Sequence, residues 1–360
     1  MKVKLEDVCE RGSSNLKQSD IVEIDGGYPI YGASGYIGNV DFYHQENPYV
    51  AVVKDGAGIG RTTLNPAKSS VIGTMQYLIP KENVLPEYLY YVVSYMHLEK
   101  YFTGATIPHI YYKDYKNEKF NLDPLDRQKT IVDILGKCEA VIKARKRELE
   151  LLDNLIKARF VEMFGDPRSN PYGFNMKMLK DTCKVITGNT PSRSVEEYYG
   201  DYVEWIKTDN IVSGLLNPTK ASEMLSEEGM KVGRAVGKDS ILMACIAGSI
   251  ASIGRVCVTD RTVAFNQQIN AVVPEDYNIL FLYVLLQLSK EYLAEEVNMA
   301  LKGILSKSKL EEKEFMVPPI ELQNQFADFV HQVDKSKVAV QKALDETQLL
   351  FESLMQKYFD

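Results

Sequence analysis

The chain has 360 residues, of which 45% are hydrophobic and 25% are charged, so it is long enough for two or three folded domains and is neither disordered nor collagen-like. Its formal net charge of −7 excludes a simple polycation that holds nucleic acid by bulk charge. The five cysteines form no C-x-x-C pair, which predicts reduced thiols and a cytoplasmic protein. The start of the chain lacks the apolar core of a signal peptide, and no apolar run approaches the ~20 residues of a spanning helix, so we expect no membrane segment.

The predicted elements alternate between strand-rich segments and long helices. Residues 1–123 contain short β-type runs separated by turn residues, such as Tyr49–Val53 before a glycine-rich turn, and one helical stretch near 87–102. After Pro124, apolar residues recur in steps of three and four up to the stop signal Phe164-Gly165-Asp166-Pro167. Residues 170–317 are again strand-rich, and a second helical pattern follows Pro319. Each long pattern has the rhythm of a coiled coil and predicts a helix of about 55 Å.

The chain contains an internal duplication. Three blocks recur in the same order, at offsets of 174, 194 and 195 residues: Leu5, Asp7 and Cys9 as Leu179, Asp181 and Cys183; Ile59-Gly60-Arg61 as Ile253-Gly254-Arg255; and Phe120-x-x-x-Pro124-Leu125-Asp126-x-Gln128 as Phe315-x-x-x-Pro319-Ile320-Glu321-x-Gln323. Because the offset grows by 20 residues between the first two blocks and by only one between the second and third, the second copy carries insertions of about 20 residues at the first of these places. Ordered recurrence of this kind indicates a duplicated unit.

The predicted fold class is α+β, with two similar mixed globules separated by two long antiparallel coiled-coil helices and an approximate two-fold axis within one chain. The predicted boundaries are 1–123 for the first globule, 124–166 for the first helix, 167–318 for the second globule and 319–360 for the second helix. Two similar globules held at a fixed separation by paired helices would present two binding surfaces about one approximate two-fold axis.

Several motifs together resemble the DNA-specificity (S) subunit of type I restriction-modification systems. The residues that carry the resemblance are the strand-and-turn motifs ending in Gln128 and Gln323, Met163–Pro167 at the first helix end, the loop Gly188–Ser192 and the two Ile-Gly-Arg turns. The resemblance covers nearly the whole length in both copies. It implies that each globule is a target-recognition domain for one half of a split site, and that the helices act as a ruler and a dock for two methyltransferase subunits. Since the two globules differ in sequence, the half-sites should differ as well.

The candidate DNA-contacting residues lie on turns and loops. Arg61 and Arg255 each end a glycine turn, where the side chain could contact phosphate or guanine. Lys54 begins the first of these two segments. That segment matches neither G-x-G-x-x-G nor a P-loop, so it is better explained as a structural turn. Thr190, Ser192 and Arg193 belong to a polar loop suited to phosphate, or simply to a solvated loop. The resemblance adds Thr106, His109 and Lys302, from loops before each closing strand. Asn266 and Gln267 could read adenine, although amides at a strand edge more often serve structure.

The remaining predictions concern the helices and catalysis. The residues expected in the core between the helices are Ile134, Leu149, Leu152, Val340, Leu344 and Phe351. The four histidines are scattered and the methyltransferase motif Asn/Asp-Pro-Pro-aromatic is missing, so we expect no catalysis, no metal and no cofactor in this chain. The resemblance places S-adenosylmethionine, ATP and Mg²⁺ on the methyltransferase and restriction-translocase partners. Two alternatives stay open: a self-sufficient DNA methyltransferase or nuclease, and a coiled-coil adaptor that binds only proteins.

Overall fold

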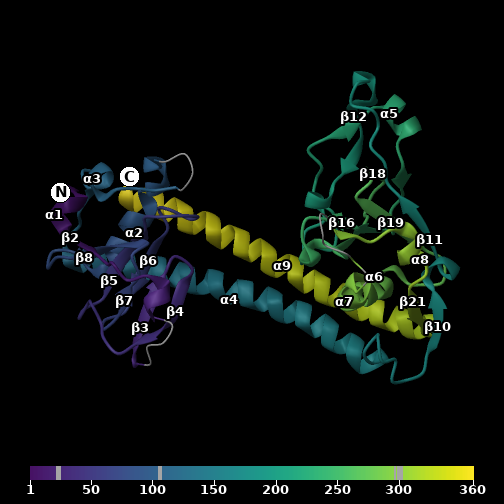
Figure 1. Ribbon diagram of the computed structural model, residues 1–360, viewed down its shortest axis with the longest axis horizontal. Coiled ribbons are helices and arrows are strands. Elements are labelled where there is room, and N and C mark those ends of the chain that lie inside the picture. Colours follow the sequence, from purple (N-terminus) through teal and green to yellow (C-terminus); the bar gives the residue numbers. More distant parts are fainter. Residues whose placement is uncertain (22–25, 104–107, 296, 298–302) are drawn as a thin grey trace. The chain divides into compact units, whose positions relative to one another are not determined.

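The computed structural model describes residues 1–21, 26–103, 108–295, 297 and 303–360 (Figure 1). Two compact units make up the chain: unit 1 comprises Met1–Lys146 and Lys342–Asp360, and unit 2 comprises Arg147–Gln341. Each unit therefore contains strand-rich segments and a part of each long helix. Within the described ranges, none of the helices combines the length and the apolar character that crossing a bilayer requires.

The described residues of unit 1 form three small sheets. The largest is antiparallel, with the order β2-β8-β5-β6; a second has the order β4-β3-β7, in which β3 and β7 run parallel; and β1 pairs with β9. The strands are β1 (Lys2–Lys4), β2 (Cys9–Ser13), β3 (Tyr28–Gly32), β4 (Gly35–Val40), β5 (Tyr49–Val53), β6 (Thr62–Asn65), β7 (Ser70–Val71), β8 (Met75–Pro80) and β9 (Lys119–Asn121). The short helices are α1 (Leu5–Val8), α2 (Pro86–Tyr95) and α3 (Tyr112–Tyr115).

Unit 2 repeats this plan with additions. Its strands are β10 (Asn175–Met178), β11 (Cys183–Thr187), β12 (Tyr199–Ile206), β13 (Met224–Leu225), β14 (Ala235–Val236), β15 (Ile241–Ala244), β16 (Ile246–Ala247), β17 (Val256–Val258), β18 (Val263–Phe265), β19 (Ile269–Pro274), β20 (Gly303–Ile304) and β21 (Glu314–Val317). Its helices besides the long ones are α5 (Glu227–Val232), α6 (Ile279–Leu288), α7 (Lys290–Ala294) and α8 (Lys307–Glu311).

The two units share one topology, which confirms the duplication predicted from the sequence. The sheet β11-β19-β15-β17 repeats the order β2-β8-β5-β6, the pair β10-β21 repeats β1-β9, and the parallel pair β12-β18 repeats β3-β7. β13 pairs with β12 as β4 pairs with β3, and the second copy adds α5 and β14, of which β14 extends the sheet beyond β18.

The central strands are apolar throughout because both of their faces are buried. In β5, Val50 and Val52 pack in one core with α2, whereas Tyr49, Ala51 and Val53 belong to a second core on the opposite face. In β15, alternate residues divide in the same way between a helix-side core and a sheet-side core. An alternating pattern would have left one face of each strand in water, so the continuous apolar runs mark the middle of each unit.

The two predicted long helices are confirmed as α4 (Leu125–Phe164) and α9 (Ile320–Phe359). In unit 1, Ile131 and Leu135 of α4 share a core with Met355 and Phe359 of α9. In unit 2, the Phe160 ring lies 5.4 Å from Phe326, and Asp153 forms a 2.7 Å ion pair with Lys337. Because residue numbers rise along α4 as they fall along α9, the two helices run antiparallel in unit 2.

One buried glutamine anchors the start of each long helix. Gln128 is fully buried; its Oε1 accepts the Leu85 N–H at 2.9 Å, and its Nε2 donates to the Asp123 carbonyl at 2.8 Å. Gln323, also fully buried, accepts the Asn278 N–H at 2.9 Å and donates to the Pro318 carbonyl at 2.8 Å. The repeated glutamine therefore ties the N-terminus of each long helix to the start of α2 or α6.

Candidate nucleic-acid interface

In unit 2, the polar loop before β12 lies beside the end of β18. The Gly188 N–H donates to the Ile269 carbonyl at 3.0 Å, and the Asn189 N–H donates to the Phe265 carbonyl at 3.1 Å. This pairing places the exposed Thr190 hydroxyl in a hydrogen bond with the exposed Gln267 side-chain oxygen. The structure therefore brings together two candidate residues that lie 77 positions apart in the sequence.

Arg193, at the end of the same loop, lies in a corner between two aromatic rings. Its guanidinium carbon is 4.6 Å from the centroid of the Tyr199 ring and 5.2 Å from that of Trp205, and the rings are edge-to-face at 74°. Nη2 of Arg193 forms a 2.7 Å ion pair with Glu223, which also pairs with Lys207. Hydrogen bonds from Lys207 and then Arg193 lower the pKa of the Glu223 carboxyl, so it is ionised at neutral pH.

The other candidates of unit 2 are more closely bound to the protein. Asn266 is buried, with its Oδ1 accepting the Gln268 N–H at 3.1 Å. Ser192 is exposed and shares a 2.8 Å hydrogen bond with Ser194. Arg255 is half-buried and donates from Nη2 to the Thr208 carbonyl at 3.3 Å. Of these three side chains, Ser192 is the most accessible to solvent.

In unit 1, Lys54 and His109 come together around one carboxylate. Asp55 forms an ion pair with Lys54 at 3.5 Å and contacts the His109 ring nitrogen Nδ1. Backbone hydrogen bonds join the same segments: the Gly56 N–H donates to the Pro108 carbonyl at 2.9 Å, and the Ile110 N–H donates to the Lys54 carbonyl at 3.0 Å. The loop before the closing strand is thus bound to the glycine turn.

The glycine-rich segment is a structural turn, as its sequence favoured. Gly56, Gly58 and Gly60 all have positive φ, and a Cβ on Gly60 would lie 2.5 Å from the Glu99 backbone nitrogen. Arg61 follows this turn with its side chain exposed. In unit 2, Gly254 has φ +74° at the equivalent position before Arg255. Two further candidates, Thr106 and Lys302, lie outside the described residues.

The residues predicted for the helix core differ in burial. Val340 and Leu344 are buried, whereas Ile134 and Leu149 are half-buried. Leu152 packs against the core of unit 2, and Phe351 packs against the core of unit 1.

Sequence reasoning missed Trp205, Lys207 and Glu223. The available signal was the single tryptophan of the chain, followed two residues later by a lysine. Glu223 carries no signal of its own, because it reaches Arg193 only through the pairing of β13 with β12.

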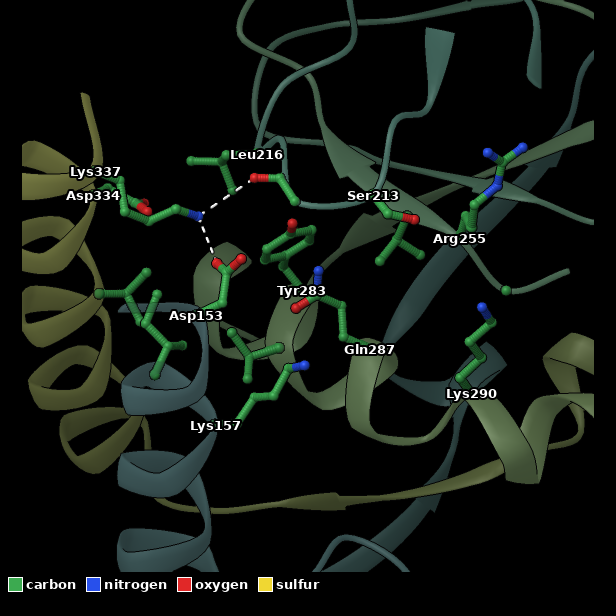
Figure 2. Close-up of a pocket in the computed structure, with 16 residues that line it drawn as sticks. Asp153, Lys157, Ser213, Leu216, Arg255, Tyr283, Gln287, Lys290, Asp334 and Lys337 are labelled. Atoms are coloured by element: carbon green, nitrogen blue, oxygen red, sulfur yellow. Dashed lines mark hydrogen bonds and ion pairs between the residues drawn. The ribbon is translucent and has the colours of Figure 1, made fainter. Parts of the chain in front are cut away.

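A cavity of about 220 Å³ in unit 2 lies between α4, α6, α9 and the loop at 213–216 (Figure 2). At one end Lys337 donates both to Asp153 and, at 3.4 Å, to the Gly214 carbonyl. At the other end, Lys290 donates to the Ala251 carbonyl. Lys337 thus fastens the loop at 213–216 to α9 and, through Asp153, links it to α4. In the part of the chain that the structure describes, no three His, Cys, Asp or Glu side chains are grouped to hold a metal ion.

Comparison with known proteins gives one consistent family. The family model of the type I restriction modification DNA specificity domain matches residues 1–152 and again 171–347. The type I restriction enzyme HindI specificity subunit of Haemophilus influenzae is 35% identical over 120 residues, 32% of this chain and 25% of that protein. The MjaIX specificity subunit of Methanocaldococcus jannaschii is 23% identical, over 78% of this chain and 69% of its own length. The chain thus spans about a quarter of the first relative and about two thirds of the second.

Two solved structures share the fold. The S subunit of a type I restriction-modification system from M. genitalium superposes with a TM-score of 0.64 at 14% identity, over 100% of this chain and 96% of the other. A chain solved in work on complex assembly and conformational transition of the type I system has a TM-score of 0.56 at 15% identity, over 99% and 97% of the two chains.

Proposed function

Because this chain belongs to the type I restriction-modification DNA specificity family, we propose that it recognises an asymmetric, two-part DNA sequence for such a system. The observation that carries the proposal is that one fold occurs twice with different polar side chains at corresponding places. Unit 1 presents Lys54, Asp55 and His109 beside its glycine turn, whereas the equivalent strand pair β16-β20 of unit 2 joins Ile246 to Ile304. Two copies that differ in this way suit two half-sites of different sequence.

The chemistry of the candidate residues suits base reading better than bulk phosphate binding. Arginine, glutamine and threonine side chains contact base edges in the major groove. The net charge of −7 means that this chain by itself neutralises few phosphates, so affinity for the DNA backbone comes largely from partner subunits. Tight, salt-resistant binding of DNA by the isolated chain would contradict this division of roles.

In the proposed assembly the chain is non-catalytic. Its long helices set the gap between the half-sites and dock two methyltransferase subunits, and a larger assembly adds the restriction-translocase subunits. The adenine to be methylated is flipped into a pocket of a methyltransferase partner. S-adenosylmethionine, ATP and Mg²⁺ belong to the partners, and the whole assembly acts in the cytoplasm.

The deciding experiment maps methylated adenines in the genome of cells that express this chain with its methyltransferase partner. We expect two short, unlike sequences separated by a fixed number of unspecified base pairs. Deleting one heptad from α4 between Ile134 and Leu152 should change that gap or abolish methylation, while both half-sites stay the same. A changed half-site with an unchanged gap would contradict the ruler function of the helices.

The two alternative functions give different results in simple assays. A self-sufficient methyltransferase would bind S-adenosylmethionine as the purified chain and methylate DNA without a partner. A protein-only adaptor would leave DNA unprotected in a footprint of the full complex, whereas a specificity subunit yields two protected blocks. The proposal therefore fails if the purified chain methylates DNA or if the complex gives no footprint.

A further inference from the structure

We propose that Arg193 reads a guanine in the half-site bound by unit 2, and that Tyr199, Trp205 and Glu223 hold it in position to do so. The inference rests on the proposed function and specifies what one part of that interface recognises. Arginine has a planar fork of donors that matches O6 and N7 of guanine in the major groove. Such a contact requires that the Arg193 side chain is exposed, is held in one orientation and keeps N–H donors free for the base.

Arg193 is exposed and oriented. Its side chain retains 57% of its surface accessible to solvent, although its guanidinium lies within 5.2 Å of both ring centroids. The rings are themselves fixed, because the Tyr199 hydroxyl donates to the Pro191 carbonyl at 2.8 Å and the Trp205 indole N–H donates to the Asn189 carbonyl at 3.3 Å. A guanidinium supported in this way loses less conformational freedom when it binds a base than one on a free side chain.

Glu223 orients the arginine without occupying all of its donors. The ion pair joins Nη2 of Arg193 to one carboxylate oxygen, and the other oxygen pairs with Lys207. A guanidinium has five N–H donors, so a contact through one nitrogen leaves the remaining edge of the fork for a base. Lys207 also lies 5.2 Å from the centroid of the Trp205 ring, and its charge offsets that of the carboxylate near DNA. Glu223 is therefore a positioning residue.

The neighbouring side chains form a surface of base-reading type. Thr190, on the loop that also carries Arg193, is exposed and hydrogen-bonded to the exposed Gln267, which lies between β18 and β19. Arginine's planar fork also binds phosphate bidentately, but the exposed Thr190 and Gln267 next to it add the hydroxyl and amide groups that read base edges. The arrangement favours a base over the DNA backbone.

Unit 1 lacks this arrangement in the residues that the structure describes. Pro80 and Pro274 are equivalent, because they pair with the equivalent Cys9 and Cys183. Counting back from them, Ser70 of β7 corresponds to Ala264 of β18. Ser70 pairs with Ile30, and Ala264 pairs with Trp205, so an isoleucine occupies the position of the tryptophan. The guanine contact is accordingly expected in only one of the two half-sites.

The test selects bound duplexes from a library with both half-sites randomised, using the full chain in complex with its methyltransferase partner. The wild-type complex should select a guanine at one position of the unit 2 half-site. Arg193→Lys keeps the charge but removes the fork, and should reduce discrimination at that position by about five- to 150-fold while other positions are unchanged. Glu223→Gln should weaken the same preference and raise non-specific binding, because a negative charge near the DNA is lost.

Arg168→Lys is the matched control. Arg168 is also exposed, pairs with Glu295 and lies 5.8 Å from the centroid of the Tyr292 ring, so the substitution removes an equivalent fork elsewhere in unit 2. Selection by this variant should equal that of the wild type. Far-ultraviolet circular dichroism checks that each variant is folded.

Three results would overturn the inference, and they separate it from the proposed function. If Arg193→Lys leaves base selection unchanged, while Arg193→Ala weakens binding equally at all positions and reduces the salt slope by about 1, the residue contacts phosphate. If the wild type selects two half-sites but no guanine that depends on Arg193, the inference is wrong and the proposed function stands. If the wild type selects no sequence at all, both fail.

Discussion

Replacing Gln323 by leucine tests whether the repeated glutamine anchors each long helix. The side chain is fully buried and satisfies the Asn278 N–H and the Pro318 carbonyl at 2.9 and 2.8 Å. Leucine of similar size would leave both groups buried without a partner, at about 1–3 kcal/mol each. The added apolar burial offsets roughly 1 kcal/mol. We therefore expect the free energy of unfolding of unit 2 to fall by about 1–5 kcal/mol.

The chain provides its own reporter, because its single tryptophan is Trp205 in unit 2. A loss of about 2 kcal/mol lowers the urea midpoint by about 1 M when m is about 2 kcal/mol/M. Gln325→Leu is the control, since the same substitution two residues further along α9 removes an exposed side chain. Equal midpoints for the two variants would refute the anchoring role.

Three further predictions concern unit 2 and the thiols. Burial raises the pKa of the Asp334 carboxyl despite the nearby Lys337. The folded state therefore binds this proton more tightly than the unfolded state, and it loses stability as the pH rises through the folded pKa. Asp334→Asn should raise the urea midpoint at pH 7 and not at pH about 3.5, and an unchanged midpoint at pH 7 would contradict this. Phe160→Ala should lower the free energy of unfolding by about 3–5 kcal/mol, measured from the urea transition of Trp205 fluorescence, because the ring is fully buried among other phenylalanines. A loss below about 1 kcal/mol would mean that neighbouring side chains move in to fill the cavity. Burial raises the pKa of four cysteine thiols to about 12. A thiol reagent at pH 8 should therefore label only Cys138 in the folded chain, and all five cysteines after denaturation. Rapid labelling of a second thiol in the folded chain would show that a buried core opens.

Part of the molecule follows from local sequence patterns. The long helices were predictable because apolar residues recur at helical spacing and because Gly165 and the prolines at 124 and 319 mark boundaries that depend only on the adjacent chain. The glycine turns were predictable for the same reason, since positive φ is a property of single residues. The duplication was visible because equivalent short motifs kept their order.

Other features depend on pairings that no local pattern contains. Gln128 and Gln323 could be recognised in the sequence because the same residue recurs in both copies of the motif. Their anchoring role could not be predicted, because it depends on the segments before α2 and α6 folding back onto the starts of the long helices. The split of each central strand between two cores likewise depends on which element covers each face.

The sequence by itself determined the tandem plan, the two long helices and the turns, because these arise from neighbouring residues and from the order of motifs. Only the tertiary structure decided that Arg193 meets Trp205 and Glu223, and that Thr190 meets Gln267. The physical reason is that these contacts join segments 12 to 77 residues apart, and strand pairing rather than local conformation selects which side chains become neighbours.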